Sequence, residues 1–135
     1  HVSNLMKVNK NIGVIDAQDA LYGNMAYDLA SLIDDVRIKT TNKLKEKIFL
    51  EFIRSNKKVD KNKLKNDFEI LSVLRNLKII GIFTRLSIRD KKHNYLKLIP
   101  HAWKLIEYRV NKNHKFKELR SVLDKYFPKK IRKLK

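Results

Sequence analysis

The chain has 135 residues, a length that suits one domain with a modest core, and its hydrophobic content of 43% argues against intrinsic disorder. It has no cysteine, which excludes disulfides and cysteine-type zinc sites. The longest apolar run, residues 79–83, is far too short to cross a bilayer, and the polar first residues do not resemble a signal peptide. We therefore expect a cytoplasmic protein with no membrane partner.

The formal net charge of +18 is distributed unevenly along the chain. Residues 1–37 have three basic and five acidic side chains, a net charge of −2, so the rest of the chain has +20. This much positive charge attracts nucleic acid or an anionic surface. However, lysine outnumbers arginine 24 to 8, whereas proteins that read bases and phosphates rely on arginine forks, and no RNA- or DNA-binding signature is present. We expect any nucleic-acid binding to be weak and unspecific.

The first 16 residues predict a β-hairpin that ends in two polar side chains. Residues 5–8 and 12–15 have the composition of strands, and residues 9–11 (Asn-Lys-Asn) have that of a turn. If Val8 pairs with Ile12, antiparallel register sets Asn4 directly across from Asp16. An amide oxygen and a carboxylate oxygen would then converge, and hard oxygen ligands of this kind suit Mg²⁺. Asn4 and Asp16 are therefore candidate metal ligands.

The rest of the chain predicts helices. Leu29, Leu32, Ile33 and Val36 follow helical spacing in a helix over 25–36, for which Asn24 is a suitable N-cap. We place the next two helices at 41–54, with a threonine cap, and at 60–77, where Asp60 is the cap. Three further helices are expected at 82–88, at 100–110 with proline in the first turn, and at 115–126 before a second proline. The fold class is mainly α with a small β-hairpin.

Several residues are open to more than one interpretation. Gly81 either ends the third helix or permits close packing of the next one. Asp34 and Asp35 are expected on a solvated helix face, and residues 129–135, a basic tail, are expected to fray. Trp103 is expected in the core rather than in a sugar-stacking platform.

Three motifs of this chain resemble those of aminoglycoside phosphotransferase-like kinases. Residues 1–6 (HVSNLM) resemble the end of the catalytic loop D-x-H-x-x-N of that family, and residues 12–20 (IGVIDAQDA) resemble its metal-binding segment. Gly23 and residues 26–32 (AYDLASL) resemble the segment that follows. Residues 81–86, 89–90 and 95–100 are similar to the sugar-kinase branch, which includes the anomeric N-acetylmuramate/N-acetylglucosamine kinases.

The resemblance implies a fold, cofactors and roles for individual residues. Residues 1–128 would form a single domain, the carboxy-terminal lobe of a protein-kinase-like fold. In the intact enzyme, which would use ATP and Mg²⁺ with a sugar substrate, Asn4 and Asp16 would hold the metal. Asp19 would either take a second metal or cap the following segment. His1 and Asp28 would support the catalytic loop, and the substrate-binding residues stay unknown.

The resemblance also implies that parts of the kinase lie outside this chain. The family's catalytic Asp would fall two positions before His1, so no catalytic residue is assigned here. The ATP-binding amino-terminal lobe would also lie outside, which implies a fragment that is inactive alone or that works with a separate amino-terminal-lobe chain. One motif position departs from the family, because Ala17 replaces the usual aromatic residue. The alternative is a non-catalytic basic helical module that binds nucleic acid or a partner protein.

Overall fold

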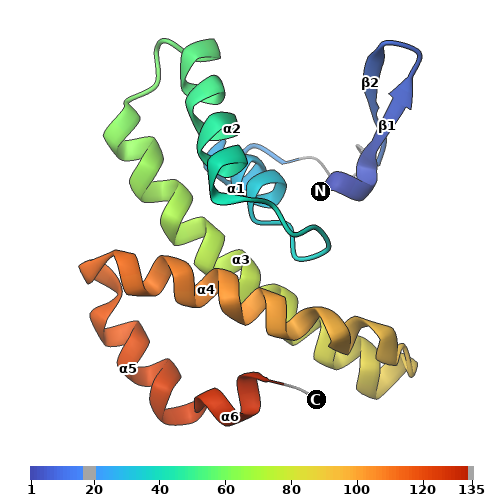
Figure 1. The fold of residues 1–135 in the computed structure, drawn as a ribbon, viewed down its shortest axis with the longest axis vertical. Coiled ribbons are helices and arrows are strands. Elements are labelled where there is room, and N and C mark those ends of the chain that lie inside the picture. The colour runs from blue at the N-terminus through green and yellow to red at the C-terminus, as the bar shows by residue number, and fades with distance from the viewer. Residues whose placement is uncertain (17–20, 134–135) are drawn as a thin grey trace. The chain divides into compact units, whose positions relative to one another are not determined.

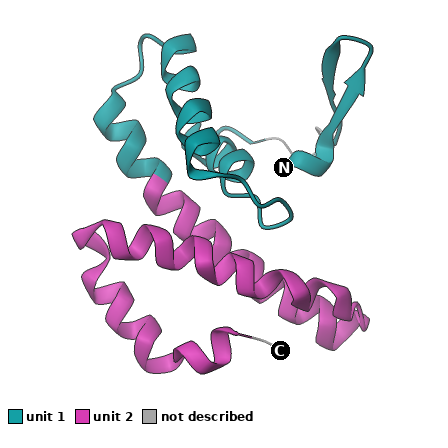
Figure 2. Ribbon diagram, in the orientation of Figure 1, with its two compact units in different colours: residues 1–68 teal, residues 69–135 magenta. Residues whose placement is uncertain are grey.

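The computed structural model describes residues 1–16 and 21–133 and is mostly helical, with one two-stranded hairpin (Figure 1). This confirms the predicted fold class at that level. The chain divides into two compact units, residues 1–68 and residues 69–135 (Figure 2). The prediction that residues 1–128 form a single kinase-like domain stays a prediction. None of the described helices is both long enough and apolar enough to cross a bilayer.

The first unit begins with a short 3-10 helix, η1 (Val2–Asn4), and a hairpin of β1 (Leu5–Val8) and β2 (Asn11–Val14). The predicted register is wrong by one residue, because Val8 pairs with Asn11 and Leu5 pairs with Val14. The turn contains two residues rather than three, and Asn9 adopts a left-handed backbone (φ 55°), which asparagine tolerates well. A shift of one residue reverses the faces of a strand, so Asp16 does not lie directly opposite Asn4 in the ladder.

Helix α1 (Ala26–Ile33) contributes most of the apolar core of the first unit. Asn24 caps it as predicted, since its side-chain oxygen accepts a hydrogen bond from the Ala26 amide. Leu29 and Ile33 are buried, whereas Leu32 is exposed. The helix ends three residues earlier than predicted, so Val36 is buried from the loop that follows it.

The two carboxylates after α1 are buried, so the predicted solvated helix face is wrong. Asp34 and Asp35 are 0% and 1% exposed. Asp34 Oδ1 lies 2.6 Å from Nζ of Lys45, which belongs to α2 (Asn42–Ser55). Because a buried charge without a partner is strongly unfavourable, this ion pair fixes where α2 lies against the end of α1.

Helices α2 and α3 start where the sequence predicts. Thr41 Oγ1 accepts from the Leu44 amide, and Asp60 Oδ1 accepts from the amides of the second and third residues of α3 (Lys61–Asp90). The aromatic rings of Phe49 and Phe68 lie 5.2 Å apart in a tilted arrangement and join the two helices within the first unit. Leu44 is exposed, however, and no residue of α2 is fully buried.

Helix α3 runs without interruption for 30 residues. The separate helix predicted at 82–88 is wrong, because Gly81 lies inside α3 and a Cβ there would meet no atom within 4 Å. The buried face is partly polar: Ser72 and Asn76 are both 0% exposed, and Asn76 donates to the Ser72 carbonyl one turn earlier. Leu74, on the other hand, is 53% exposed.

The second unit combines the later part of α3 with α4 (Ile99–Lys112), α5 (Lys117–Tyr126) and α6 (Lys129–Arg132). Two 3-10 turns, η2 (His93–Leu98) and η3 (His114–Phe116), connect the helices. Pro100 lies in the first turn of α4, as predicted. Trp103 is 5% exposed and its ring lies 5.5 Å from that of Phe127, which confirms its place in the core.

Residues 129–132 of the basic tail form α6, so the prediction that the tail frays is wrong for these residues. The Arg132 side chain is 6% exposed and donates to Glu107 at 2.8 Å and to Asp124 at 2.6 Å. Its guanidinium also lies 5.0 Å from the centre of the Trp103 ring. A helix of four residues is unstable in isolation, so these contacts hold α6 against α4 and α5.

We expect Gly81→Ala to stabilise the protein by about 0.5–1 kcal/mol in urea unfolding, because alanine loses less backbone entropy than glycine inside a helix. The open space around Gly81 leaves room for the methyl group. The matched control is Gly13→Ala in the hairpin, where the added Cβ would lie 3.1 Å from Val8 Cγ2 and should give no gain. A loss of stability in Gly81→Ala would contradict a continuous α3.

The hydrogen bond from Arg132 holds the pKa of the Asp124 carboxyl below its ordinary value. A lowered pKa means that the stabilisation is complete above the unfolded-state value of about 3.9 and is lost as the pH falls through the folded-state value. We therefore expect α6 amides to lose protection from hydrogen exchange in acid below about pH 4. In Arg132→Gln, the Asp124 pKa measured by NMR should return toward its ordinary value; an unchanged pKa would contradict the pairing.

Candidate metal-binding site

The candidate metal ligands lie in contact at the open end of the hairpin. The Nδ2 atom of Asn4 donates to the Oδ2 atom of Asp16 at 3.0 Å. The predicted register placed these two residues opposite each other, but that register is wrong by one residue, so the contact arises differently. Beyond the last strand pair, the Ile15 amide donates to the Asn4 carbonyl, and Asp16 then adopts a left-handed backbone (φ 66°). This local reversal returns the Asp16 side chain to Asn4 in spite of the shifted register.

The donor set fits a hard divalent cation. Asp16 is exposed and Asn4 is partly exposed, so both side chains are accessible from solvent. A half-turn of the Asn4 amide exchanges its nitrogen and oxygen and directs Oδ1 toward the Asp16 carboxylate. Among the described residues, no three acidic or histidine side chains cluster as a metal site. Two protein oxygens with open positions for water and phosphate are what Mg²⁺ commonly uses.

The segment that presents Asn4 is fixed by a buried carboxylate that the sequence reasoning missed. Asp35 Oδ2 accepts a hydrogen bond from the Val2 amide at 3.0 Å, and Asp35 Oδ1 accepts from the Arg37 amide at 2.9 Å. The Asn4 amide in turn donates to the His1 carbonyl at 2.9 Å, which closes η1. The signal in the sequence was that Asp34 and Asp35 stand between two apolar residues, Ile33 and Val36. Both of these are buried, which places the two intervening carboxylates in the interior.

The structure describes two of the other predicted site residues, Asp28 and His1. Asp28 is exposed in the first turn of α1, where its charge favours the helix dipole. His1 is exposed, and its carbonyl rather than its ring takes part in η1. Asp19, the candidate for a second metal, and Ala17 lie outside the described residues. The metal and support roles of these residues stay predictions.

The second unit has a shallow apolar groove beside α3. Arg85 and Arg89 lie on it. Arg89 is paired with Asp90 at 2.6 Å, and this hydrogen bond lowers the pKa of the Asp90 carboxyl. The other residues that line the groove are Leu77, Ile80, Gly81, Thr84, Ile88, Trp103 and Phe127. The groove is thus lined mainly by apolar residues, and Thr84, Arg85 and Arg89 are its hydrogen-bonding groups.

Comparison with known proteins finds sequence similarity to one class of enzymes. The chain is 35% identical over 105 residues to the N-acetylmuramate/N-acetylglucosamine kinase of Neisseria meningitidis, covering 73% of this chain and 31% of the relative. This chain is similar to sugar kinases. The kinase of the same name from Caulobacter vibrioides is 29% identical over 123 residues (90% of this chain, 33% of the relative), and that from Pseudomonas aeruginosa is 30% identical over 138 residues (89% and 37%).

The chain spans about a third of the length of these curated relatives. No profile of a known protein family matches it. These relatives confirm the predicted similarity to N-acetylmuramate/N-acetylglucosamine kinases at the level of sequence, whereas membership of the aminoglycoside phosphotransferase-like family stays a prediction. Whether the helices form a kinase-like carboxy-terminal lobe stays a prediction.

We expect Asp35→Ala to destabilise the chain by about 2–4 kcal/mol in urea unfolding and to speed hydrogen exchange at the Val2 amide, because two amides lose a charged acceptor. The matched control is Asp28→Ala, an exposed carboxylate near a helix N-terminus, which should cost about 0.5 kcal/mol. If Asp28→Ala releases the Val2 amide as strongly as Asp35→Ala does, the support role belongs to Asp28 instead.

Proposed function

We propose that this chain is part of an ATP-dependent sugar kinase related to aminoglycoside phosphotransferase-like kinases, and that its hairpin holds the magnesium ion of the phosphoryl-transfer site. The observation that supports this most directly is the contact between Asn4 and Asp16, at 3.0 Å. The two residues come from separate segments and match the two metal-binding positions of that family. The relatives are named as N-acetylmuramate/N-acetylglucosamine kinases, so the acceptor class is an N-acetylated amino sugar.

Within this proposal, the residues of this chain bind the metal ion and orient the segment that carries its ligands. Bound Mg²⁺ supplies charge neutralisation for the phosphates during transfer. Asn4 Oδ1 and the Asp16 carboxylate would hold the ion and so determine where its positive charge lies. Asp35 holds η1 by its backbone and thereby positions Asn4. His1 lies where the family's catalytic loop continues toward its catalytic Asp, so η1 would orient that loop as well.

The groups that bind ATP and accept the hydroxyl proton would be supplied by residues outside this chain, on the same polypeptide or on a separate amino-terminal lobe. Catalysis of this type depends on holding nucleotide, metal and acceptor in one geometry, so we expect this chain alone to have no turnover. The relatives are named as kinases, which favours this proposal over a non-catalytic basic module.

Metal binding can be tested on the chain by itself. Mn²⁺, a paramagnetic substitute for Mg²⁺, should broaden the NMR signals of Asn4 and Asp16 first, because broadening falls steeply with distance from the ion. Asp16→Asn should abolish this local effect, since it removes the ligand charge. Lys10→Gln, a change in the hairpin turn, is the control and should leave the broadening intact. Broadening centred elsewhere would exclude this pair as the metal site.

Activity requires the remainder of a kinase. A chimera in which this chain replaces the matching segment of the Neisseria meningitidis relative should phosphorylate N-acetylmuramate or N-acetylglucosamine with ATP. Asp16→Asn should lower its turnover about a hundredfold or more, in the range seen when one charge-stabilising group is lost. Lys10→Gln should leave the rate within about twofold. An active chimera that tolerates Asp16→Asn would contradict the proposed role.

A further inference from the structure

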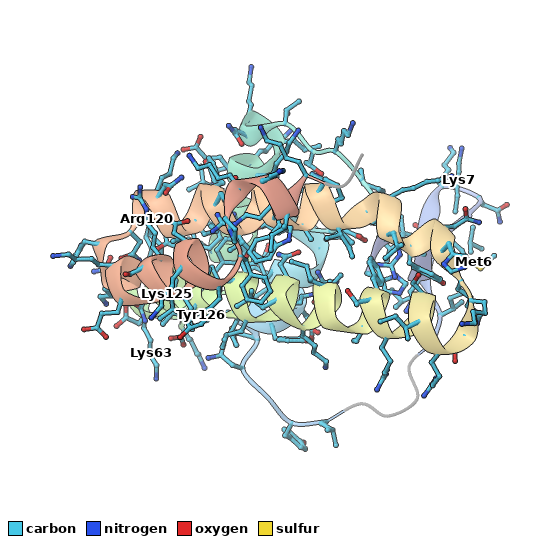
Figure 3. The ribbon with its side chains drawn as sticks, turned by 90° about the horizontal axis from the view of Figure 1, so that it is seen from below. Met6, Lys7, Lys63, Arg120, Lys125 and Tyr126 are labelled. Carbon is cyan, nitrogen blue, oxygen red and sulfur yellow. The ribbon has the colours of Figure 1, made fainter. Side chains whose placement is uncertain are left out.

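The outward sides of α5 and α6 combine lysines with exposed apolar side chains. Residues 117–133 include seven basic and two acidic residues, a net charge of +5. Lys125 on α5 and the neighbouring pair Lys129 and Lys130 on α6 are exposed. Figure 3 shows the side chains of Lys125 and Tyr126 beside each other near the end of α5. The Lys125 ammonium lies 5.2 Å from the centre of the Tyr126 ring.

Three large apolar residues are exposed among these lysines. Val122 is 51% exposed, Tyr126 is 62% exposed and Ile131 is 53% exposed. Val122 and Tyr126 are four residues apart and therefore lie on one side of α5, while Leu123 packs inward. A single exposed apolar residue needs no explanation, but here three exposed apolar residues and three exposed lysines lie within ten residues of sequence. We refer to Val122, Lys125, Tyr126, Lys129, Lys130 and Ile131 as the α5–α6 face.

The orientation of α6 is fixed from the inside. Arg132 points inward and is held by Glu107, Asp124 and the Trp103 ring. Because Arg132 faces the core, the other residues of this short helix are left on the solvent side. The two acidic residues are already subtracted in the net charge of +5, and neither belongs to the α5–α6 face. Asp124 is paired with Arg132 at 2.6 Å and with Arg120 at 3.7 Å, which leaves Glu118 as the exposed carboxylate of the segment without such a pair.

We propose that the α5–α6 face binds the surface of an anionic lipid bilayer. Lysines are attracted to anionic headgroups, tyrosine favours the membrane interface, and aliphatic side chains gain free energy by entering the boundary with the acyl chains. Single-stranded nucleic acid fits less well. It would use the lysines and the one exposed ring, but Val122 and Ile131 offer no surface on which bases stack. This is a peripheral contact, which the sequence-based expectation of no membrane partner did not consider.

The test is co-sedimentation of the full chain with vesicles of phosphatidylcholine containing 30% phosphatidylglycerol, compared with phosphatidylcholine alone. Binding should need the anionic lipid. Lys125→Gln/Lys129→Gln/Lys130→Gln should lower the partition coefficient by about a hundredfold, at roughly fivefold for each lysine near an anionic surface. Val122→Ser/Ile131→Ser, which keeps every charge, should lower it by about tenfold through lost apolar burial.

Matched controls separate this face from the general charge of the chain. Lys43→Gln/Lys47→Gln/Lys57→Gln removes the same charge from exposed positions elsewhere, and Ile12→Ser/Val14→Ser removes two exposed apolar side chains from the hairpin. Both should change the partition coefficient by less than about twofold. If the control lysine variant binds as weakly as the α5–α6 variant, attraction is diffuse and the proposal is wrong.

The apolar variant decides between lipid and nucleic acid. Binding to a single-stranded RNA of 20 nucleotides at the same ionic strength should be unaffected by Val122→Ser/Ile131→Ser. Vesicle binding that is equally unaffected would overturn insertion into the interface. The proposal would be wrong, and the α5–α6 face would bind nucleic acid instead, if RNA binding is tighter than vesicle binding at 150 mM salt and depends on Tyr126.

Discussion

Two adjacent buried carboxylates at the end of α1 determine how the first unit is assembled. Asp34 reaches α2 through Lys45, and Asp35 reaches the first residues of the chain through the Val2 amide. Moving two charges out of water is costly, so the arrangement is stable only when each has its partners in place. The helix, the loop after it and η1 are therefore coupled: a change that displaces one leaves a buried charge uncompensated.

This coupling gives the candidate metal site its position. The hairpin alone would be a weak support, because an isolated pair of strands is marginally stable in water and most of its apolar side chains are exposed. The hydrogen bond from Val2 to Asp35 and the short turn of η1 place Asn4 directly before the start of β1. Asp16 then reaches Asn4 through a left-handed backbone rather than through cross-strand pairing. Both side chains stay accessible from solvent, since Asp16 is exposed and Asn4 is partly exposed.

In the second unit, Arg132 has the corresponding organising role. A guanidinium buried at the chain's end is satisfied by two carboxylates, a carbonyl and an aromatic face, and this converts a short basic segment into an ordered helix. The same inward placement leaves lysines and Ile131 on the outside. The internal requirement of one buried charge thus decides which side chains of α6 are exposed.

The sequence by itself determined the element types, the caps at Asn24, Thr41 and Asp60, the core position of Trp103, and the similarity to sugar kinases, because these depend on local spacing and local side-chain chemistry. It also paired Asn4 with Asp16, although through a register that is wrong. Only the tertiary structure decided that α3 continues through Gly81, that Asp34 and Asp35 are buried, and that Arg132 anchors α6. Each of these depends on partners distant in sequence. The sequence pattern around a carboxylate or guanidinium does not show whether that group is buried. Burial depends on whether the fold places an opposite charge or an amide next to it.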